Sequence, residues 1–188
     1  MASPSTSDSE VVTSSANGNV NSELLGHLPY DVVDSSDLDA LKTFPGVQLH
    51  YSAAASFEDM VDAARAEGIY LVALSGFRSL EDQEYLFFKV KEERNQGAAQ
   101  RAEVSAPPGH SEHHTGFAVD IGDEDSPETH VEVSFEDTTA FEWLEQNAAR
   151  FSFELSFPEG NKQGVSYEPW HWRFVGNQES LETFYKGR

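Results

Sequence analysis

The chain has 188 residues, enough for one domain with a sizeable core, and carries 33 acidic against 12 basic side chains, a net charge of −21. Such a charge keeps a protein soluble and repels nucleic acid and anionic lipid, so no nucleic-acid partner is expected. Cysteine is absent, which excludes disulfides, thiolate metal sites and a cysteine nucleophile. Any metal would therefore be held by histidines and carboxylates.

The N-terminal region is unlike the rest of the chain. Residues 1–22 are rich in Ser, Thr, Asn, Asp and Gly, which predicts a disordered leader or linker. The first residues lack the basic and apolar pattern of a secretory signal, as expected for a cytoplasmic protein or one whose export segment has been removed. No apolar run is long enough to span a bilayer. Residues 23–188 are predicted to form one domain, and without a long exposed apolar stripe we expect a monomer.

The first predicted elements are a helix, a strand and a second helix. The first helix is predicted to begin at Ser56 and stop at Gly68. Its apolar residues recur at helical spacing: Phe57, Met60, Val61 and Ala64. A short apolar run over 69–74 predicts a buried strand. A turn at 75–79 then leads into a helix over 80–96, with Ser79 and Asp82 as its capping pair.

The second half of the chain mixes strands and helices without regular alternation. Gly116 to Ile121 predicts a strand, because its apolar side chains alternate. A helix is predicted over 138–150, strands over 151–157 and 170–175, and a short closing helix around 181–185. This order predicts an α+β fold with an antiparallel sheet.

The first chemical cluster is a group of histidines close to an aspartate. Three of the seven histidines lie between Gly109 and Asp120. One of them could meet Asp120 across a loop-to-strand junction, where Gly116 lets the backbone turn tightly. A buried aspartate at a strand end can equally be a structural hydrogen-bond acceptor, so this cluster alone leaves both interpretations open.

The second cluster places a carboxylate among aromatic side chains. Glu168 stands three residues before His171, with Trp170 and Trp172 beside it. Aromatic walls exclude water and raise the pKa of a carboxylate, which suits a general base near neutral pH. The tryptophans are expected to pack around the site. The alternative is a core strand in which Glu168 forms an ion pair with Arg173.

Together the clusters supply the parts of a hydrolytic metal site. A catalytic zinc needs three protein ligands with nitrogen or oxygen donors and an open position for water. Without cysteine, two histidines and one aspartate are a plausible set. Zinc lowers the pKa of its water and polarises a carbonyl, and Glu168 would take the proton.

The spacing of these residues resembles a known signature. Ser111-x-His113-x-x-Gly116-x-Ala118-x-Asp120, followed by Glu168-x-x-His171, resembles the paired motifs of the VanY-type D-alanyl-D-alanine carboxypeptidases. The segment 75–79 with Gln83 resembles the upstream motif of that family. The order and separations match, and the resemblance extends from about residue 24 to residue 185.

The resemblance implies both a fold and a metal site. The fold would be a compact α+β domain with a central antiparallel sheet flanked by helices. The zinc ligands would be His113, Asp120 and His171, and the catalytic base would be Glu168. Residues 23–188 would then form the zinc carboxypeptidase domain.

The resemblance also assigns residues to substrate. Arg78 would stabilise the developing oxyanion or hold the substrate carboxylate, while Gln83 and Ser111 would line the pocket. The residues themselves agree on Arg78, because a guanidinium placed just before a helix N-terminus forms an anion site.

The remaining histidines are not expected to bind the metal. His114 directly follows His113 and should point elsewhere, as a residue around the site or at its rim. His110 precedes the motif and is expected at the pocket mouth. Three others have no partners in the sequence and are expected to be structural: His27, His50 and His130.

The function implied is removal of D-alanine from peptidoglycan stem peptides, at the cell envelope or in the periplasm. An L,D-carboxypeptidase or a D,D-dipeptidase with the same zinc machinery is an alternative. A non-catalytic peptidoglycan-binding module is another, because an acidic surface could oppose docking on an anionic wall. The complete ligand and base set argues against the binding module.

Overall fold

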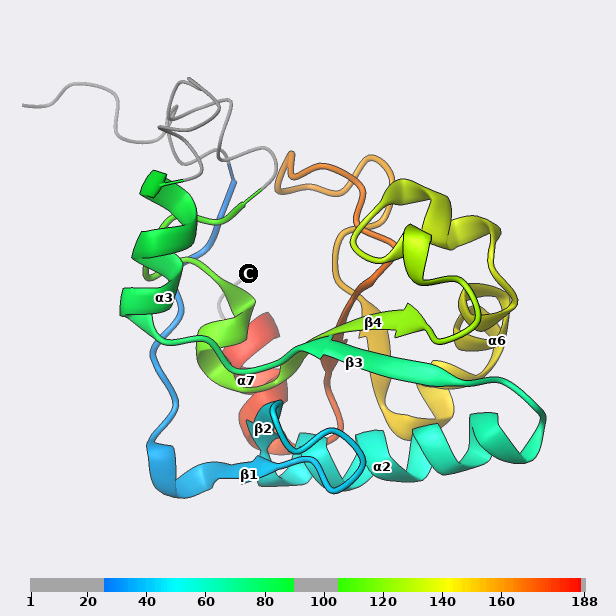
Figure 1. The fold of residues 1–188 in the computed structure, drawn as a ribbon. Helices are drawn as coiled ribbons and strands as arrows, with labels where there is room; N and C mark the ends of the chain where they lie inside the picture. The colour runs from blue at the N-terminus through cyan, green and yellow to red at the C-terminus, as the bar shows by residue number, and fades with distance from the viewer. Residues whose placement is uncertain (1–25, 90–104, 187–188) are drawn as a thin grey trace, which may run out of the picture.

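The computed structural model describes residues 26–89 and 105–186 (Figure 1). A four-stranded antiparallel sheet with strand order β3–β4–β6–β5 crosses the middle of the molecule. Its strands are β3 (Leu71–Ser75), β4 (Ala118–Asp123), β5 (Phe153–Leu155) and β6 (His171–Phe174). A smaller antiparallel pair joins β1 (Leu38–Ala40) to β2 (Gln48–His50). The predicted α+β class with an antiparallel sheet is confirmed.

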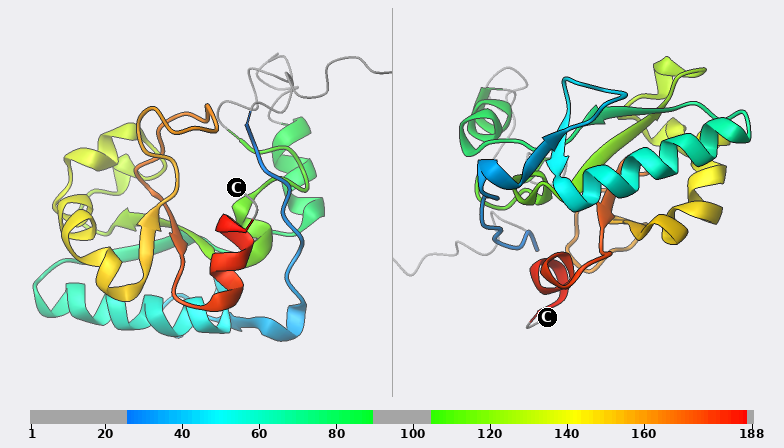
Figure 2. Two further views of the ribbon diagram at one scale, coloured as in Figure 1. Left: turned by 180° about the vertical axis from the view of Figure 1, so that it is seen from behind. Right: turned by 90° about the horizontal axis from the view of Figure 1, so that it is seen from below.

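Helices flank the central sheet. The longest in the described residues, α2, runs beneath the sheet, as Figure 1 and the view from below in Figure 2 both show. The α-helices are α2 (Tyr51–Ala66), α3 (Leu80–Glu84), α6 (Thr139–Asn147) and α7 (Gln178–Tyr185), and α3 continues into a π-helical turn, η2 (Tyr85–Lys89). Short 3₁₀ turns connect them: η1 (Ser35–Asp37), η3 (Glu112–Thr115), η4 (Pro127–Thr129), η5 (Val133–Asp137) and η6 (Ala148–Phe151).

The start of α2 differs from the prediction at Ser56. The helix begins at Tyr51, because the His50 ring caps it by accepting a hydrogen bond from the backbone N–H of Ser52. Small side chains extend the buried stripe back into this first turn, Ala53 being fully buried. Ser56 lies inside the helix, and its hydroxyl donates to the Phe151 carbonyl at 2.6 Å.

The other predicted elements occur in their predicted places with shifted ends. The strand predicted over 151–157 covers only β5, because η6 continues α6 and closes on Ser152 in the left-handed conformation. Ser79 caps α3 by accepting from the Asp82 N–H at 3.1 Å, as predicted. The predicted continuation of that helix beyond residue 89, and the leader over 1–22, lie outside the described residues.

The core fills the space between the sheet and the helices that flank it. Its largest fully buried side chains are mostly aromatic or aliphatic and include Phe57, Phe117, Phe135, Phe153, Phe184, Leu49, Met60 and Ile121. Burial of such side chains is the main term that stabilises the domain. Over residues 26–89 and 105–186, no helix has the length and apolarity that crossing a membrane requires.

The strand registers bring chemically active residues together. Asp120 on β4 pairs directly with His171 on β6, so the two side chains lie on the same face of the sheet. On the other side of β4 the register with β3 shifts between Ala73 and Ser75, which sets Ser75 opposite Asp120. Such bulges bend a strand and redirect its side chains, often beside active sites.

We predict that Gly116→Ala destabilises the fold more than Gly109→Ala. Both glycines have left-handed backbones, with φ of 70° and 78°, and alanine in that conformation costs about 1–2 kcal/mol. A Cβ at Gly116 would also lie 2.9 Å from the His50 backbone nitrogen, whereas at Gly109 nothing lies within 4 Å. We expect a loss of roughly 3 kcal/mol for Gly116→Ala against about 1 for Gly109→Ala. Urea unfolding measures both, and equal losses would contradict the steric argument.

Candidate metal centre

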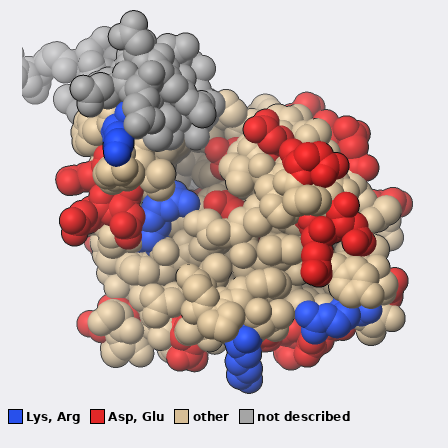
Figure 3. Space-filling model, in the orientation of Figure 1, with Lys and Arg blue, Asp and Glu red and all other residues tan. Residues whose placement is uncertain are grey.

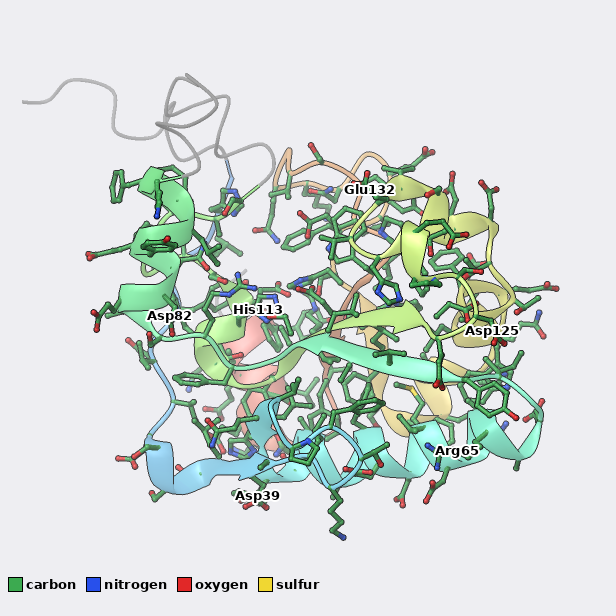
Figure 4. All side chains as sticks on the ribbon, viewed as in Figure 1. Asp39, Arg65, Asp82, His113, Asp125 and Glu132 are labelled. Atoms are coloured by element: carbon green, nitrogen blue, oxygen red, sulfur yellow. The ribbon has the colours of Figure 1, made fainter. Side chains whose placement is uncertain are left out.

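Three buried side chains converge at the middle of the molecule: His113 from η3, Asp120 from β4 and His171 from β6. One donor atom of each lies within 4.8 Å of the donor atoms of the other two. Figure 4 shows the labelled His113 above β3 in the interior. These are the three residues that the sequence predicted as metal ligands.

Each histidine presents one ring nitrogen to the cluster and has the other held in place. For His113, Nε2 lies 3.3 Å from the Asp120 carboxylate and Nδ1 lies 2.7 Å from the Gly76 carbonyl oxygen. For His171, Nδ1 lies 3.0 Å from Asp120 and Nε2 lies 3.1 Å from Glu112. Metal-binding histidines usually donate their second N–H to a carbonyl or carboxylate in this way. The arrangement therefore fits a metal held by two imidazole nitrogens and a carboxylate oxygen, a donor set that zinc accepts.

The charges of the cluster balance without a metal only if His171 is protonated. Burial alone would raise the pKa of Asp120, but His113 and His171 outweigh it and hold that pKa below its ordinary value. Burial opposes protonation of His171, yet its contacts with Asp120 and Glu112 raise its pKa to about 10. Burial lowers the pKa of His113. The centre is thus a place that favours positive charge, which a divalent cation supplies more effectively than a proton.

Glu168 stands beside the cluster at the turn before β6. Its Oε2 lies 3.9 Å from Nδ1 of His171, and its side chain is 13% exposed. Burial raises the pKa of Glu168 to about 7, with His171 opposing the rise and the Asp120 and Glu112 carboxylates adding to it. A carboxyl group with this pKa can exchange a proton near neutral pH.

The alternative ion pair between Glu168 and Arg173 does not form. Arg173 instead lies 2.8 Å from Glu112 and 2.7 Å from Glu154. Trp172 closes the turn by donating its indole N–H to the Pro169 carbonyl. Arg173 is paired with Glu112 and Glu154, so it does not balance the charge of Glu168.

Arg78 is held against the same centre from the β3–α3 turn. Its guanidinium donates to Gln83 Oε1 and to Ser75 Oγ, each at 2.9 Å, and one of its nitrogens lies 3.9 Å from Asp120. Gln83 is itself fixed by donating to the Ala106 carbonyl at 2.6 Å. A guanidinium fixed in this way can stabilise negative charge next to the cluster.

A cavity of about 180 Å³ opens onto these groups. Figure 3 shows a hollow in this face, with basic side chains at its left rim and acidic ones spread over the right of the molecule. The cavity lining includes every site residue that the sequence predicted: Arg78, Gln83, Ser111, His113, Asp120, Glu168 and His171.

The other histidines lie outside the metal cluster, as predicted. His114 is fully buried, and its Nδ1 lies 2.7 Å from the Arg78 carbonyl, so it supports the arginine turn and is not at a rim. His110 lines the cavity as predicted. His50 caps α2 and His130 contacts the Asp123 carbonyl, both structural roles. His27, expected to be structural, also lines the cavity.

Glu112 and Val131 are among the residues of this site that sequence reasoning missed. Glu112, only 3% exposed, contacts His171, but its position between Ser111 and His113 gave no sign that it is buried. Val131 lines the cavity with a positive φ of 59°. Such a backbone is rare for a β-branched residue and has no sequence signal.

Comparisons with known proteins agree with this geometry. The family model described as VanY, D-alanyl-D-alanine carboxypeptidase, matches residues 46–177. The D-alanyl-D-alanine carboxypeptidase of Enterococcus faecalis is 38% identical over 139 residues, which cover 69% of this chain and 49% of that protein. The chain thus spans about half the length of this relative.

Solved structures share the fold. The LdcB LD-carboxypeptidase, described in connection with peptidoglycan recognition, has a TM-score of 0.66 at 30% identity, covering 79% of this chain and 72% of that one. A mutant of the vancomycin resistance D,D-pentapeptidase VanY in complex with Zn(II) has a TM-score of 0.61 at 32% identity, covering 81% and 84%. The likeness therefore includes relatives of both D,D and L,D type.

We predict that Glu168 makes the metal-free protein less stable as pH rises. Its native pKa of about 7 lies above the ordinary 4.5, so between these values the folded state keeps a proton that the unfolded state has lost. Stability is therefore lost from about pH 4.5 to 7, by roughly 3 kcal/mol. Glu168→Gln removes this dependence. Urea unfolding with chelator at pH 5 and pH 8 measures the free energy of unfolding of both proteins. Relative to the wild type, the variant should be more stable at pH 8 than at pH 5. A difference that is the same at both pH values would contradict the assignment.

Proposed function

The chain belongs to the VanY family of D-alanyl-D-alanine carboxypeptidases, and on that premise we propose that it is a zinc-dependent carboxypeptidase that removes the terminal D-alanine from peptidoglycan stem peptides. The family is enzymatic, and its named members are peptidases. The observation that carries the proposal is the buried His113–Asp120–His171 group with Glu168 beside it in one cavity.

Zinc is the cofactor that this donor set favours. His113, Asp120 and His171 would hold it, and all three line the cavity. When bound, zinc would polarise the scissile carbonyl and lower the pKa of a water molecule. The Zn(II) complex of a structural relative supports this choice.

The chain's own residues then handle the proton and the developing charge. Glu168 takes the proton of the attacking water and passes it to the departing amine of D-alanine, since its raised pKa allows both steps near neutral pH. Arg78 stabilises the oxyanion, because its guanidinium is fixed next to Asp120 and faces the cavity. Gln83 and Ser111 line the pocket that receives the peptide.

The stem-peptide substrate and the D,D preference rest on the resemblance to relatives. An L,D-carboxypeptidase with the same machinery is the second candidate, favoured by the likeness to LdcB. A D,D-dipeptidase would use the same residues, and a binding module without catalysis would not need the complete set. A relative described in connection with peptidoglycan recognition supports a location at the cell envelope, and we expect a monomer.

We predict that the chain releases D-alanine from a synthetic stem pentapeptide and that a zinc chelator abolishes the release. Added zinc should restore it, because the three proposed ligands lie on elements buried in the core. A tetrapeptide tested in parallel distinguishes L,D from D,D cleavage. Both assays should use the same high ionic strength, because salt screens the repulsion between an anionic peptide and the net charge of −21. No release from either peptide by zinc-loaded protein would favour the dipeptidase or the binding module.

Glu168→Gln should retain stoichiometric zinc and lose turnover by about 10²–10⁴-fold, the usual contribution of a general base. Metal analysis and single-turnover release of D-alanine on the same sample provide the two readouts. A variant that keeps zinc and wild-type turnover would overturn the assignment of the base.

Arg78→Lys should lower kcat by about 10²–10³-fold with a smaller change in KM. Lysine keeps the charge but loses the fixed fork that Gln83 and Ser75 orient. If KM rises and kcat holds, Arg78 binds the substrate carboxylate instead of the oxyanion.

A further inference from the structure

We propose that Glu112 is a positioning residue that holds His171 in its metal-binding orientation by accepting a hydrogen bond from Nε2. The inference rests on the proposed zinc function, because it concerns how one of the zinc ligands is oriented. Nothing in the proposed reaction steps uses Glu112, although it is a buried carboxylate beside the centre.

The carboxylate of Glu112 is fully occupied by donors. Its Oε2 lies 3.1 Å from His171 Nε2 and 2.7 Å from the Ser156 hydroxyl. Its Oε1 accepts from Arg173 at 2.8 Å and from the Tyr30 hydroxyl at 3.2 Å. A carboxylate has about four acceptor positions, so none remains for a metal or a substrate. Glu112 is therefore neither a fourth ligand nor a second base.

Glu112 also faces a fixed cation. Its Oε1 lies 2.8 Å from a guanidinium nitrogen of Arg173. Arg173 is itself fixed by Glu154 at 2.7 Å and lies over the ring of Phe184. The carboxylate of Glu112 is thus paired with a cation outside the metal cluster.

An ionised acceptor at Nε2 determines which tautomer His171 adopts. With Nε2 donating to Glu112, the neutral ring carries its lone pair on Nδ1, the nitrogen that lies 3.0 Å from Asp120 in the cluster. His113 obtains the same constraint from a backbone carbonyl, that of Gly76. Of the two histidine ligands, only His171 relies on a side chain, so substitution can remove its constraint.

The test is zinc affinity of the full chain, measured by competition with a chromophoric chelator. Glu112→Gln should weaken zinc binding about 10–100-fold, the usual effect of removing such a partner. Ser156→Ala is the matched control: it removes a donor from the same oxygen but leaves the contact with His171, and should change affinity by less than about 3-fold. Circular dichroism of the metal-free forms checks the fold. If Glu112→Gln does not fold, Glu112→Asp keeps the charge opposite Arg173 while withdrawing from His171, and the same loss is expected.

A double-mutant cycle separates positioning from a general structural role. In a His171→Ala background, Glu112→Gln should cause no further loss of zinc affinity, because the residue that it positions is gone. An equal loss in both backgrounds, or wild-type affinity for folded Glu112→Gln, would overturn the positioning role while the zinc function stands. A wild-type chain that binds no zinc would overturn the proposed function and the positioning role with it.

Discussion

The pairing of β4 with β6 is the constraint on which the site depends. It sets Asp120 directly opposite His171, so two of the three cluster residues are fixed by main-chain hydrogen bonds of the central sheet. The third, His113, arrives from η3, whose end is turned by Gly116 so that the chain can enter β4. Because each residue is carried by a regular element buried in the core, the cluster needs little rearrangement to receive a cation.

The electrostatics of the centre follow from this packing. Asp120 and Glu112 lie on opposite sides of the His171 ring, and Glu168 stands at its edge. Three carboxyl groups this close cannot all ionise in a buried site without positive charge. Arg173 balances Glu112, and His171 or a metal balances Asp120, which leaves Glu168 as the group with the raised pKa. Glu168 is thus the one of these three carboxyl groups whose charge is not balanced, which is why we propose it as the general base.

The resemblance of the sequence to the VanY-type motifs predicted which residues converge in the cavity, and the structure brings His113, Asp120, Glu168 and His171 together there. The sequence also predicted the antiparallel sheet and most elements. It missed what depends on long-range packing: the early start of α2, where the His50 ring is the cap, and the burial of Glu112, whose partners Tyr30 and Ser156 are distant in sequence. In a chain with 33 acidic residues, no local pattern indicates that Glu112 is buried.

The contrast between exterior and interior indicates how such acidity is compatible with the proposed cleavage of a carboxylate-bearing peptide. A net charge of −21 repels anionic substrates at long range, but salt screens that field within about 10 Å. Inside the cavity the balance is different, because Asp120, Glu112 and Glu168 are each countered by a fixed cation or by a proton, and Arg78 faces the open space. The local charge that a peptide terminus would meet is therefore set by the buried residues and not by the net charge of the surface.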